Sequence, residues 1–133
     1  MSGLLQERLR PLARRHRRQS ISATNIGRDR VDSRTPDIVV VHPDTARTSK
    51  AFDATAELVV EVISAGEDLD TKLDFFAEWN VNEYLTVDYR THEHTLGARA
   101  PVDGSEWIAV TRSDVLDMEM DELFADFDWP RLP

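Results

Sequence analysis

Three charged residues stand at positions where the surrounding sequence calls for apolar side chains. Asp37 opens the β-branched run Ile-Val-Val-Val directly after Pro36, and Glu61 interrupts the apolar run Leu-Val-Val-Glu-Val-Ile. Lys72 follows shortly afterwards, in a segment with helical periodicity. Because charged groups are rarely buried without a partner, each of the three needs a counter-charge, a bound ion or hydrogen bonds.

Together these residues form a chemical set that can hydrolyse a phosphodiester. Two carboxylates on neighbouring strands can bind a hard divalent cation such as Mg²⁺ or Mn²⁺, which prefers oxygen ligands. Such a cation polarises the phosphodiester and acidifies a water molecule, while a lysine orients that water or stabilises the developing negative charge. Asp37, Glu61 and Lys72 are therefore predicted to be catalytic, with Asp37 and Glu61 binding the metal.

Each residue also has an interpretation without catalysis. Asp37 could cap the turn at the start of its strand. Lys72 could extend its ammonium group to water, or form an internal ion pair with Glu61, in which case the fold would serve as a binding or assembly module. A third possibility is an acidic protein that mimics nucleic acid, which leaves the position of Lys72 unexplained.

The apolar pattern predicts a mixed sheet flanked by helices, with the order α-β-β-β-α-β. Helices are expected at residues 4–18 and from the capping box Ser64 to Glu67, or within a turn of it, as far as about Asn80, and strands at residues 20–26, 37–41, 58–63 and 83–88. Pro11 is expected to kink or divide the first helix, and residues 42–56 read as a long loop. The fold class is therefore α/β.

Helical geometry predicts where Lys72 points. At about 100° per residue, Lys72 falls in the middle of the apolar arc that contains Leu69, Leu73 and Phe76. That arc packs on the sheet, so an anion is expected opposite Lys72.

The C-terminal part is predicted to extend the sheet. Residues 92–99 and 107–111 read as edge strands, and residues 118–127 contain a short helix. His92 and His94 would then share one face of a strand. They are interpreted either as a polar edge or as part of a metal site that lacks an evident third ligand.

Charge is distributed unevenly along the chain. Residues 1–34 hold nine arginines and three acidic residues, a net charge of +6. Because the whole chain has a net charge of −9, residues 35–133 carry a net charge of −15. Four clustered arginines are the candidates for contacts with nucleic-acid phosphates: Arg14, Arg15, Arg17 and Arg18. The alternatives are a solvated helix face or docking on the acidic part of a second subunit.

Composition excludes several other classes of protein. The chain has no cysteine, so it contains no disulfide and no cysteine-ligated metal. It has no apolar run long enough to span a membrane and no secretion signal, so a cytoplasmic protein is expected. Its five glycines form no phosphate-binding motif, which disfavours a nucleotide cofactor. The length predicts a single domain, residues 1–133: a basic segment 1–34, a core 35–90 and an acidic extension 91–133.

Four segments, in this order, resemble the Uma-two family of restriction endonucleases. They are Pro36-Asp37-Ile-Val-Val, Glu57-Leu-Val-Val-Glu61-Val-Ile-Ser64, Asp70-Thr-Lys72 and Asn82-Glu-Tyr84-Leu-Thr-Val-Asp88. The family belongs to the PD-(D/E)XK, restriction-endonuclease-like superfamily, whose core has the same α-β-β-β-α-β order. The resemblance implies a Mg²⁺-dependent endonuclease that acts on DNA, as a homodimer.

The resemblance also implies roles for individual residues. Asp37 is similar to the superfamily's metal-binding aspartate and Glu61 to its second acid. The superfamily lysine normally lies two positions after that acid, where Ile63 stands here, and Lys72 matches the helix lysine that substitutes for it in this family. The backbone carbonyl of Ile63 would be a further metal ligand.

The sequence departs from the family pattern in two places. An N-terminal segment with a Tyr-Glu-Leu stretch is missing, and the loop between Ser64 and Lys72 lacks the usual proline. A folded relative without catalytic activity is therefore the alternative to an active nuclease.

Overall fold

The central element of the fold is a six-stranded sheet. The computed structural model describes residues 3–22, 25–27, 33–34, 36–42, 51–52, 56–64, 67–99 and 106–130. The strands of the sheet are, in spatial order, β1 (Gln19–Ser22), β4 (Ile38–Val41), β6 (Leu58–Val62), β7 (Glu83–Asp88), β8 (Glu93–Arg99) and β9 (Trp107–Val110). β6 and β7 are parallel, and the other neighbours in this sheet are antiparallel. The sheet is therefore mixed, as predicted.

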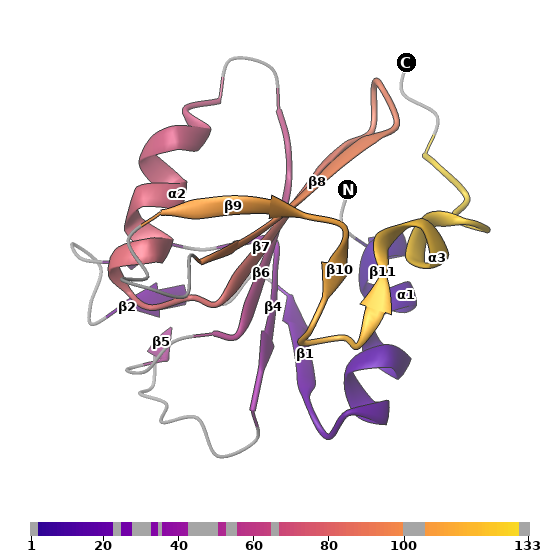
Figure 1. Cartoon of the computed structure of the whole chain (residues 1–133), viewed down its shortest axis with the longest axis horizontal. Helices are drawn as coiled ribbons and strands as arrows, with labels where there is room; N and C mark the ends of the chain where they lie inside the picture. Colours follow the sequence, from indigo (N-terminus) through magenta and orange to yellow (C-terminus); the bar gives the residue numbers. More distant parts are fainter. Residues whose placement is uncertain are drawn as a thin grey trace.

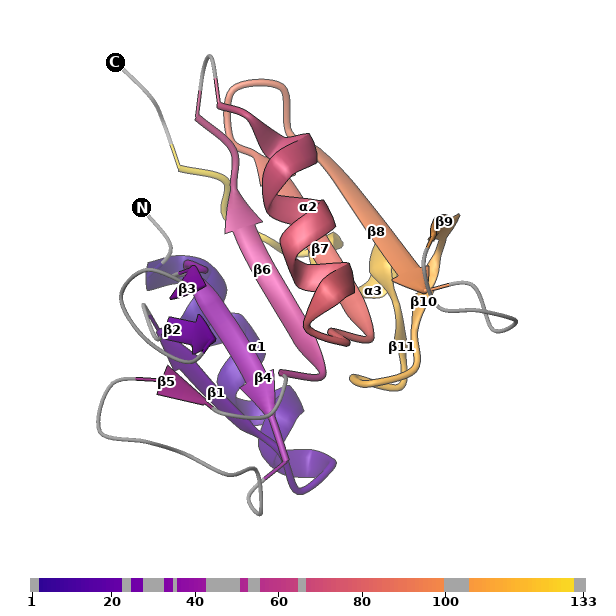
Figure 2. The same ribbon diagram turned by 90° about the vertical axis from the view of Figure 1, so that its left-hand side faces the viewer.

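Helices cover both faces of this sheet. Figure 1 shows α1 (Gly3–Arg15) and α3 (Met120–Phe124) on one side and α2 (Leu69–Glu78) on the other. Side chains alternate between the two faces of a strand. Ile38 and Val40 accordingly pack with α1, whereas Val39 packs with the phenylalanines of α2. Figure 2 shows α2 lying along this second face, beside β6.

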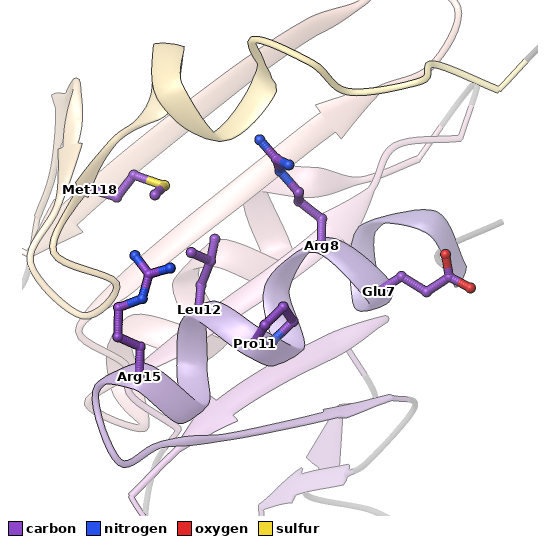
Figure 3. A pocket seen from close by; sticks show the side chains of 6 residues that line it. All are labelled: Glu7, Arg8, Pro11, Leu12, Arg15 and Met118. Carbon is purple, nitrogen blue, oxygen red and sulfur yellow. The ribbon is translucent and has the colours of Figure 1, made fainter.

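The predicted α/β class and core order are confirmed, because α1, β1, β4, β6, α2 and β7 follow one another in the chain. The expectation that Pro11 could divide the first helix is wrong, since α1 runs continuously from Gly3 to Arg15. Leu9 and Leu12 are buried on either side of Pro11 and pack into the same core. This packing stabilises both halves of the helix as one element. Figure 3 shows Pro11 and Leu12 on this continuous helix, with Met118 facing them from the C-terminal part.

The start of α2 differs from the predicted capping box. The N-cap is Asp68, whose carboxylate accepts a hydrogen bond of 3.2 Å from the backbone N–H of Thr71. The backbone N–H of Ser64 donates instead to the carboxylate of Glu67, at 3.0 Å. Glu67 thus bonds to Ser64 ahead of the helix, and an aspartate closer to the first helical residue supplies the cap.

The C-terminal strands were predicted, but their places in the sheet were only partly right. β8 lies between β7 and β9, so it is not an edge strand, whereas β9 lies at the edge of the order described. Gly97 of β8 pairs with Tyr84 of β7, and a Cβ at position 97 would overlap the Tyr84 ring. A strand with a glycine in its interior therefore fits inside this sheet.

Of the two histidines, only His94 belongs to β8. His92 lies in the turn before β8 with a positive φ, and its ring stacks on Trp129 at 4.7 Å. His94 stacks on Phe124 at 4.4 Å. Phe124 and Trp129 themselves stack, with centroids 5.4 Å apart, so both histidine rings pack on one aromatic cluster at the C-terminal end of the chain. The predicted strand starts at residue 93 and not at 92, and the structure gives the two rings aromatic partners.

Most of the short strands were not predicted from the sequence; the exception is the strand Asn25–Gly27, which overlaps the strand predicted at residues 20–26. β10 (Arg112–Ser113) pairs with β11 (Met118–Glu119), and β2 (Asn25–Gly27) pairs with β3 (Ser33–Arg34) and β5 (Ala51–Phe52). β5 falls within residues 42–56, which were expected to be a loop; residues 43–50 and 53–55 lie outside the described residues. Strands of two or three residues are too short to show periodicity. None of the helices in the described ranges is long and apolar enough to cross a membrane.

Candidate active site

Strand pairing brings Asp37 and Glu61 to one end of the sheet. In the antiparallel pair β4 and β6, Ile38 lies opposite Val60 and Val39 opposite Val59. Continuing this register by one residue places Asp37, just before β4, opposite Glu61. Both positions face α2, because they alternate with the residues that pack on α1.

A backbone hydrogen bond fixes the Asp37 carboxylate. Oδ2 of Asp37 accepts a hydrogen bond of 2.7 Å from the backbone N–H of Val62, the residue after Glu61. The bond ties the start of β4 to the end of β6, so Asp37 does act as a local cap. It also leaves acceptor capacity, since an ionised carboxylate offers about four lone-pair sites. The capping role and a ligand role are therefore compatible.

Glu61 is a buried carboxyl group with a strongly shifted pKa. Its exposed fraction is 4%. Burial raises its pKa from 4.5 to about 7; the charge of Lys72 opposes this rise, and the charge of Asp37 adds to it. A shift of this kind, caused by desolvation and by specific charged neighbours, is typical of functional sites.

Lys72 meets Glu61 from the facing helix. Its Nζ lies 3.4 Å from Oε2 of Glu61 and also contacts the carboxylate of Glu67. Although partial burial acts in the opposite direction, the hydrogen bond and charge of Glu67 and the charge of Glu61 raise the pKa of Lys72. The ammonium group is therefore charged, and Glu61 is the anion that the helical geometry predicted opposite it.

Glu67 is a member of this cluster that the sequence interpretation assigned only to a capping box. Its side chain is 15% exposed and contacts Lys72, five residues further on. Burial would raise its pKa, but hydrogen bonds from Lys72 and from the backbone of Ser64 lower the pKa below its ordinary value. The available signal was an acidic residue in the loop between Glu61 and Lys72.

The donor set fits a divalent cation that keeps part of its hydration shell. In the described part of the chain, no group of three or more histidine or acidic side chains is placed to hold a metal. Mg²⁺, however, is usually bound by one or two carboxylates together with water and substrate phosphates. Asp37 and Glu61 supply such a pair. Ile63, whose N–H donates to the carbonyl of Val87 at 2.9 Å, follows at the same end of β6.

The candidate phosphate-binding arginines lie elsewhere. Arg14 and Arg15 are exposed in the last turn of α1, and Arg17 is exposed just after it. Nε of Arg18 donates to the carboxylate of Glu57 at 2.9 Å. Glu57 precedes β6 and Glu61 is near its end, so Glu57, the partner of Arg18, lies about 13 Å from Glu61 along the strand, at roughly 3.3 Å per residue. The structure does not bring these arginines to the carboxylate pair.

Comparison with known proteins gives a family and a fold. The chain matches the Uma2 family, described as "Putative restriction endonuclease", over residues 1–127. Its fold is similar to the crystal structure of a "putative nuclease belonging to DUF820" from Anabaena variabilis, with a TM-score of 0.57 and 12% identity over 92% of this chain and 79% of that chain. None of the curated proteins matches the chain. These findings confirm the family resemblance and the fold class expected from the sequence.

Proposed function

Because the chain belongs to the Uma2 family of putative restriction endonucleases, we propose that it is a metal-dependent nuclease that hydrolyses phosphodiester bonds in DNA. One observation carries this proposal: the buried carboxyl group of Glu61 contacts the ammonium group of Lys72, and Asp37, which the N–H of Val62 holds in place, lies at the same end of the sheet. Burying Glu61 among charges is costly for folding, and a catalytic site gives a reason for retaining it.

We assign Asp37, Glu61 and the backbone carbonyl of Ile63 as the groups that would hold Mg²⁺ or Mn²⁺. When bound, such a cation polarises the scissile phosphate and lowers the pKa of a water molecule. Asp37 is held for this role by the backbone N–H of Val62. Glu61 must be ionised to take part, which its pKa of about 7 allows at slightly alkaline pH.

Lys72 supplies a positive charge beside the carboxylates. Its ammonium group stabilises the negative charge that develops on the phosphate and orients the attacking water. Glu67 contacts the same ammonium group and so restricts its position. The Asp68 cap fixes the first turn of α2, from which Lys72 extends.

A second function is supported by the ion pairs themselves. The ammonium group of Lys72 contacts the carboxylates of both Glu61 and Glu67. A nuclease fold that acts only as a binding or assembly module would keep these ion pairs for stability. It would bind no metal, and removal of either partner would destabilise it by leaving a buried charge unpaired.

The proposal is tested by nicking of supercoiled plasmid DNA. Wild type is expected to nick the plasmid in Mg²⁺ and not in EDTA. Asp37→Asn is expected to be inactive, although its side-chain oxygen can still accept the hydrogen bond from Val62. Equal cleavage by the two proteins would identify a contaminating nuclease and contradict the proposal.

Metal affinity is expected to depend on pH through Glu61. Its pKa of about 7 means that the carboxyl group must lose a proton before it binds a cation at lower pH. The apparent affinity for Mn²⁺ should therefore fall by up to about tenfold for each pH unit below 7. Calorimetric titration between mildly acidic and alkaline pH checks this dependence. An affinity that is constant across this range would exclude Glu61 as a ligand.

We also propose that the arginine cluster, Arg14, Arg15, Arg17 and Arg18, binds DNA phosphates. The triple substitution of Arg14, Arg15 and Arg17 by glutamine should weaken binding to duplex DNA. The slope of the logarithm of the binding constant against the logarithm of the salt concentration should become less steep, by about 0.9 for each phosphate that the variant no longer neutralises. Because these residues lie away from the carboxylate pair, the single-turnover cleavage rate at saturating protein should not change. Fluorescence anisotropy over a salt series measures the slope, and an unchanged slope would contradict the assignment.

A further inference from the structure

β9 forms one edge of the six-stranded sheet, and in the described part of the chain no strand pairs with its outer side. Figure 2 shows it beyond β8, at the end of the sheet away from β4. Its sequence is Trp-Ile-Ala-Val, without a charged residue or a proline. Natural edge strands usually carry such residues or are covered, because an exposed apolar edge pairs readily with another strand. The opposite edge strand, β1, is Gln-Ser-Ile-Ser and is mostly polar.

The hydrogen-bond pattern shows which backbone groups of β9 point outward. The N–H of Arg99 donates to the carbonyl of the residue before β7, at 3.2 Å, so the backbone groups of Arg99 point toward β7. Consecutive residues of an antiparallel ladder point to opposite sides. Ala98 therefore points toward β9, and its partner Ile108 points back toward β8. The N–H and C=O groups of Trp107 and Ala109 consequently point away from β8, toward the outer edge.

An isoleucine at the centre of β9 is exposed to solvent. Ile108 is 45% exposed, and Leu4 of α1 is the other exposed large apolar side chain among the described residues. Ala109, next to Ile108, is exposed as well. Ile108 stands between the two residues whose backbone groups point outward. The edge of β9 thus presents an apolar side chain flanked on both sides by hydrogen-bonding groups.

Contacts on the inner side hold β9 in place. The ring of Trp107 packs on Tyr84 with centroids 5.0 Å apart, and its Nε1 donates to the carbonyl of Leu73 in α2 at 3.1 Å. All four residues of β9 pair with β8. A strand that is already ordered loses little conformational entropy when it pairs, which favours association.

The outer edge of β9 complements a second copy of the same strand. When two copies pair antiparallel about a twofold axis at Ile108, Trp107 of each copy lies opposite Ala109 of the other. The outward N–H and C=O groups of these residues then bond to each other on both sides of the axis. The two Ile108 side chains lie directly opposite each other on one face of the joined sheet, where cross-strand apolar pairs stabilise a sheet.

Charge favours the same antiparallel arrangement. Glu106 stands just before β9 and Arg112 two residues after its end, and both side chains are exposed. Antiparallel pairing brings the start of one strand to the end of the other, so these opposite charges of different copies approach each other. Arg112 contacts Asp117 in its own copy, and its five N–H donors leave it able to bind a second carboxylate.

We propose that β9 is a dimerisation edge, at which two copies of this chain join their sheets through an antiparallel β9–β9 pair centred on Ile108. One pair of short strands is small beside the roughly 1,200 to 2,000 Å² of surface that stable interfaces bury, so the dimer dissociates on dilution. The twofold axis is perpendicular to the joined sheet, so α2 of both copies lies on the same side. Dimer formation of this kind requires neither metal nor DNA.

Sedimentation velocity at a series of protein concentrations, without metal or DNA, tests this edge. Wild type is expected to shift from monomer to dimer as the concentration rises. Ile108→Lys places like charges opposite each other across the axis and should raise the dimer Kd about tenfold or more. Leu4→Lys, which makes the same change at the other exposed large apolar residue, should leave the dimer Kd unchanged.

Ala109→Pro is a second variant, which acts through the backbone. Proline removes the outward N–H of Ala109 but no hydrogen bond to β8, and it is tolerated at edge positions of this kind. The dimer Kd should again rise, while the unfolding temperature, measured on dilute monomeric protein, should remain close to that of wild type. A much lower unfolding temperature would show that this N–H bonds within the sheet and would contradict its outward direction.

Two results of the sedimentation series would overturn the inference. A wild type that remains monomeric at the highest concentrations would leave the edge to a different partner. A dimer that neither Ile108→Lys nor Ala109→Pro weakens, or that Leu4→Lys weakens equally, would place the interface elsewhere. Either result would leave the proposed nuclease function standing, because Asp37 and Glu61 belong to one copy and lie away from β9 in the sheet order.

Discussion

Replacing Glu61 by glutamine is expected to stabilise the metal-free protein at pH 8 and to abolish DNA cleavage. The two effects have one cause, because the carboxylate that would bind the cation is buried and costly to ionise. Its exposed fraction is 4%, and its pKa is raised from 4.5 to about 7. Glutamine has nearly the same shape but carries no charge.

The sign of the pH effect follows from the raised pKa. The folded state holds the Glu61 proton more tightly than the unfolded state, so its contribution to stability is complete below pH 4.5 and is lost as the pH rises through 7. Between pH 5 and pH 8 this loss amounts to about 2 to 3 kcal/mol in the wild type. The Glu61→Gln protein lacks this contribution, so its advantage over the wild type grows by that amount.

Urea unfolding of both proteins in EDTA at pH 5 and pH 8 measures this difference. Other titrating groups, including buried Glu83, whose pKa burial also raises, occur in both proteins and cancel. Plasmid nicking in Mg²⁺ is assayed on the same preparations. A pH dependence of stability identical in the two proteins would show that Glu61 is not a desolvated carboxyl group. Cleavage by Glu61→Gln at the wild-type rate would remove Glu61 from the catalytic set.

Replacing Lys72 by methionine is expected to lower the cleavage rate about 10²- to 10³-fold while Mn²⁺ binding persists. A single preorganised charge at the reacting centre contributes an effect of this size. Methionine keeps most of the apolar contacts of the lysine stem with the sheet. The loss of cleavage rate therefore measures the contribution of the ammonium group, and the persistence of Mn²⁺ binding shows that the carboxylates are still in place.

Stability separates this result from the assembly-module alternative. The Lys72 side chain is 31% exposed, so solvent screens its ion pairs, and their loss should cost about 1 kcal/mol or less. If the ion pairs served only stability, the Lys72→Met substitution would instead lower the free energy of unfolding by more than this and would leave metal binding and cleavage unchanged. Asp74→Asn, on the opposite face of the same helix from Lys72, serves as the control for general effects on α2. A Lys72→Met protein that cleaves at the wild-type rate would contradict the catalytic assignment.

The convergence of Asp37, Glu61 and Lys72 could be predicted because it depends on regular local geometry. Alternation along two strands places the carboxylates on one face, and helical periodicity turns the lysine toward them. The hydrogen bond between Asp37 and Val62 then needs only the register of the pairing strands. Each of these steps can be read from a repeating pattern.

Other features depend on contacts between distant segments and could not be predicted in this way. The contact of Glu67 with Lys72 depends on a loop conformation. The packing of the buried Tyr89 ring depends on the C-terminal aromatic residues Phe127 and Trp129 that contact it. The charge pattern likewise could not show that Arg18 pairs with Glu57, at the far end of β6.

The most direct test of the proposed function is calorimetric titration of metal-free wild type with Mn²⁺ at pH 8, because metal binding requires no knowledge of the DNA sequence that is cut. Asp37→Asn and Glu61→Gln are titrated in parallel, after circular dichroism has shown that all three proteins are folded. We expect a single cation to bind the wild type and no binding by either variant. A folded wild-type protein that binds no Mn²⁺ would contradict the metal-dependent nuclease and favour the assembly module.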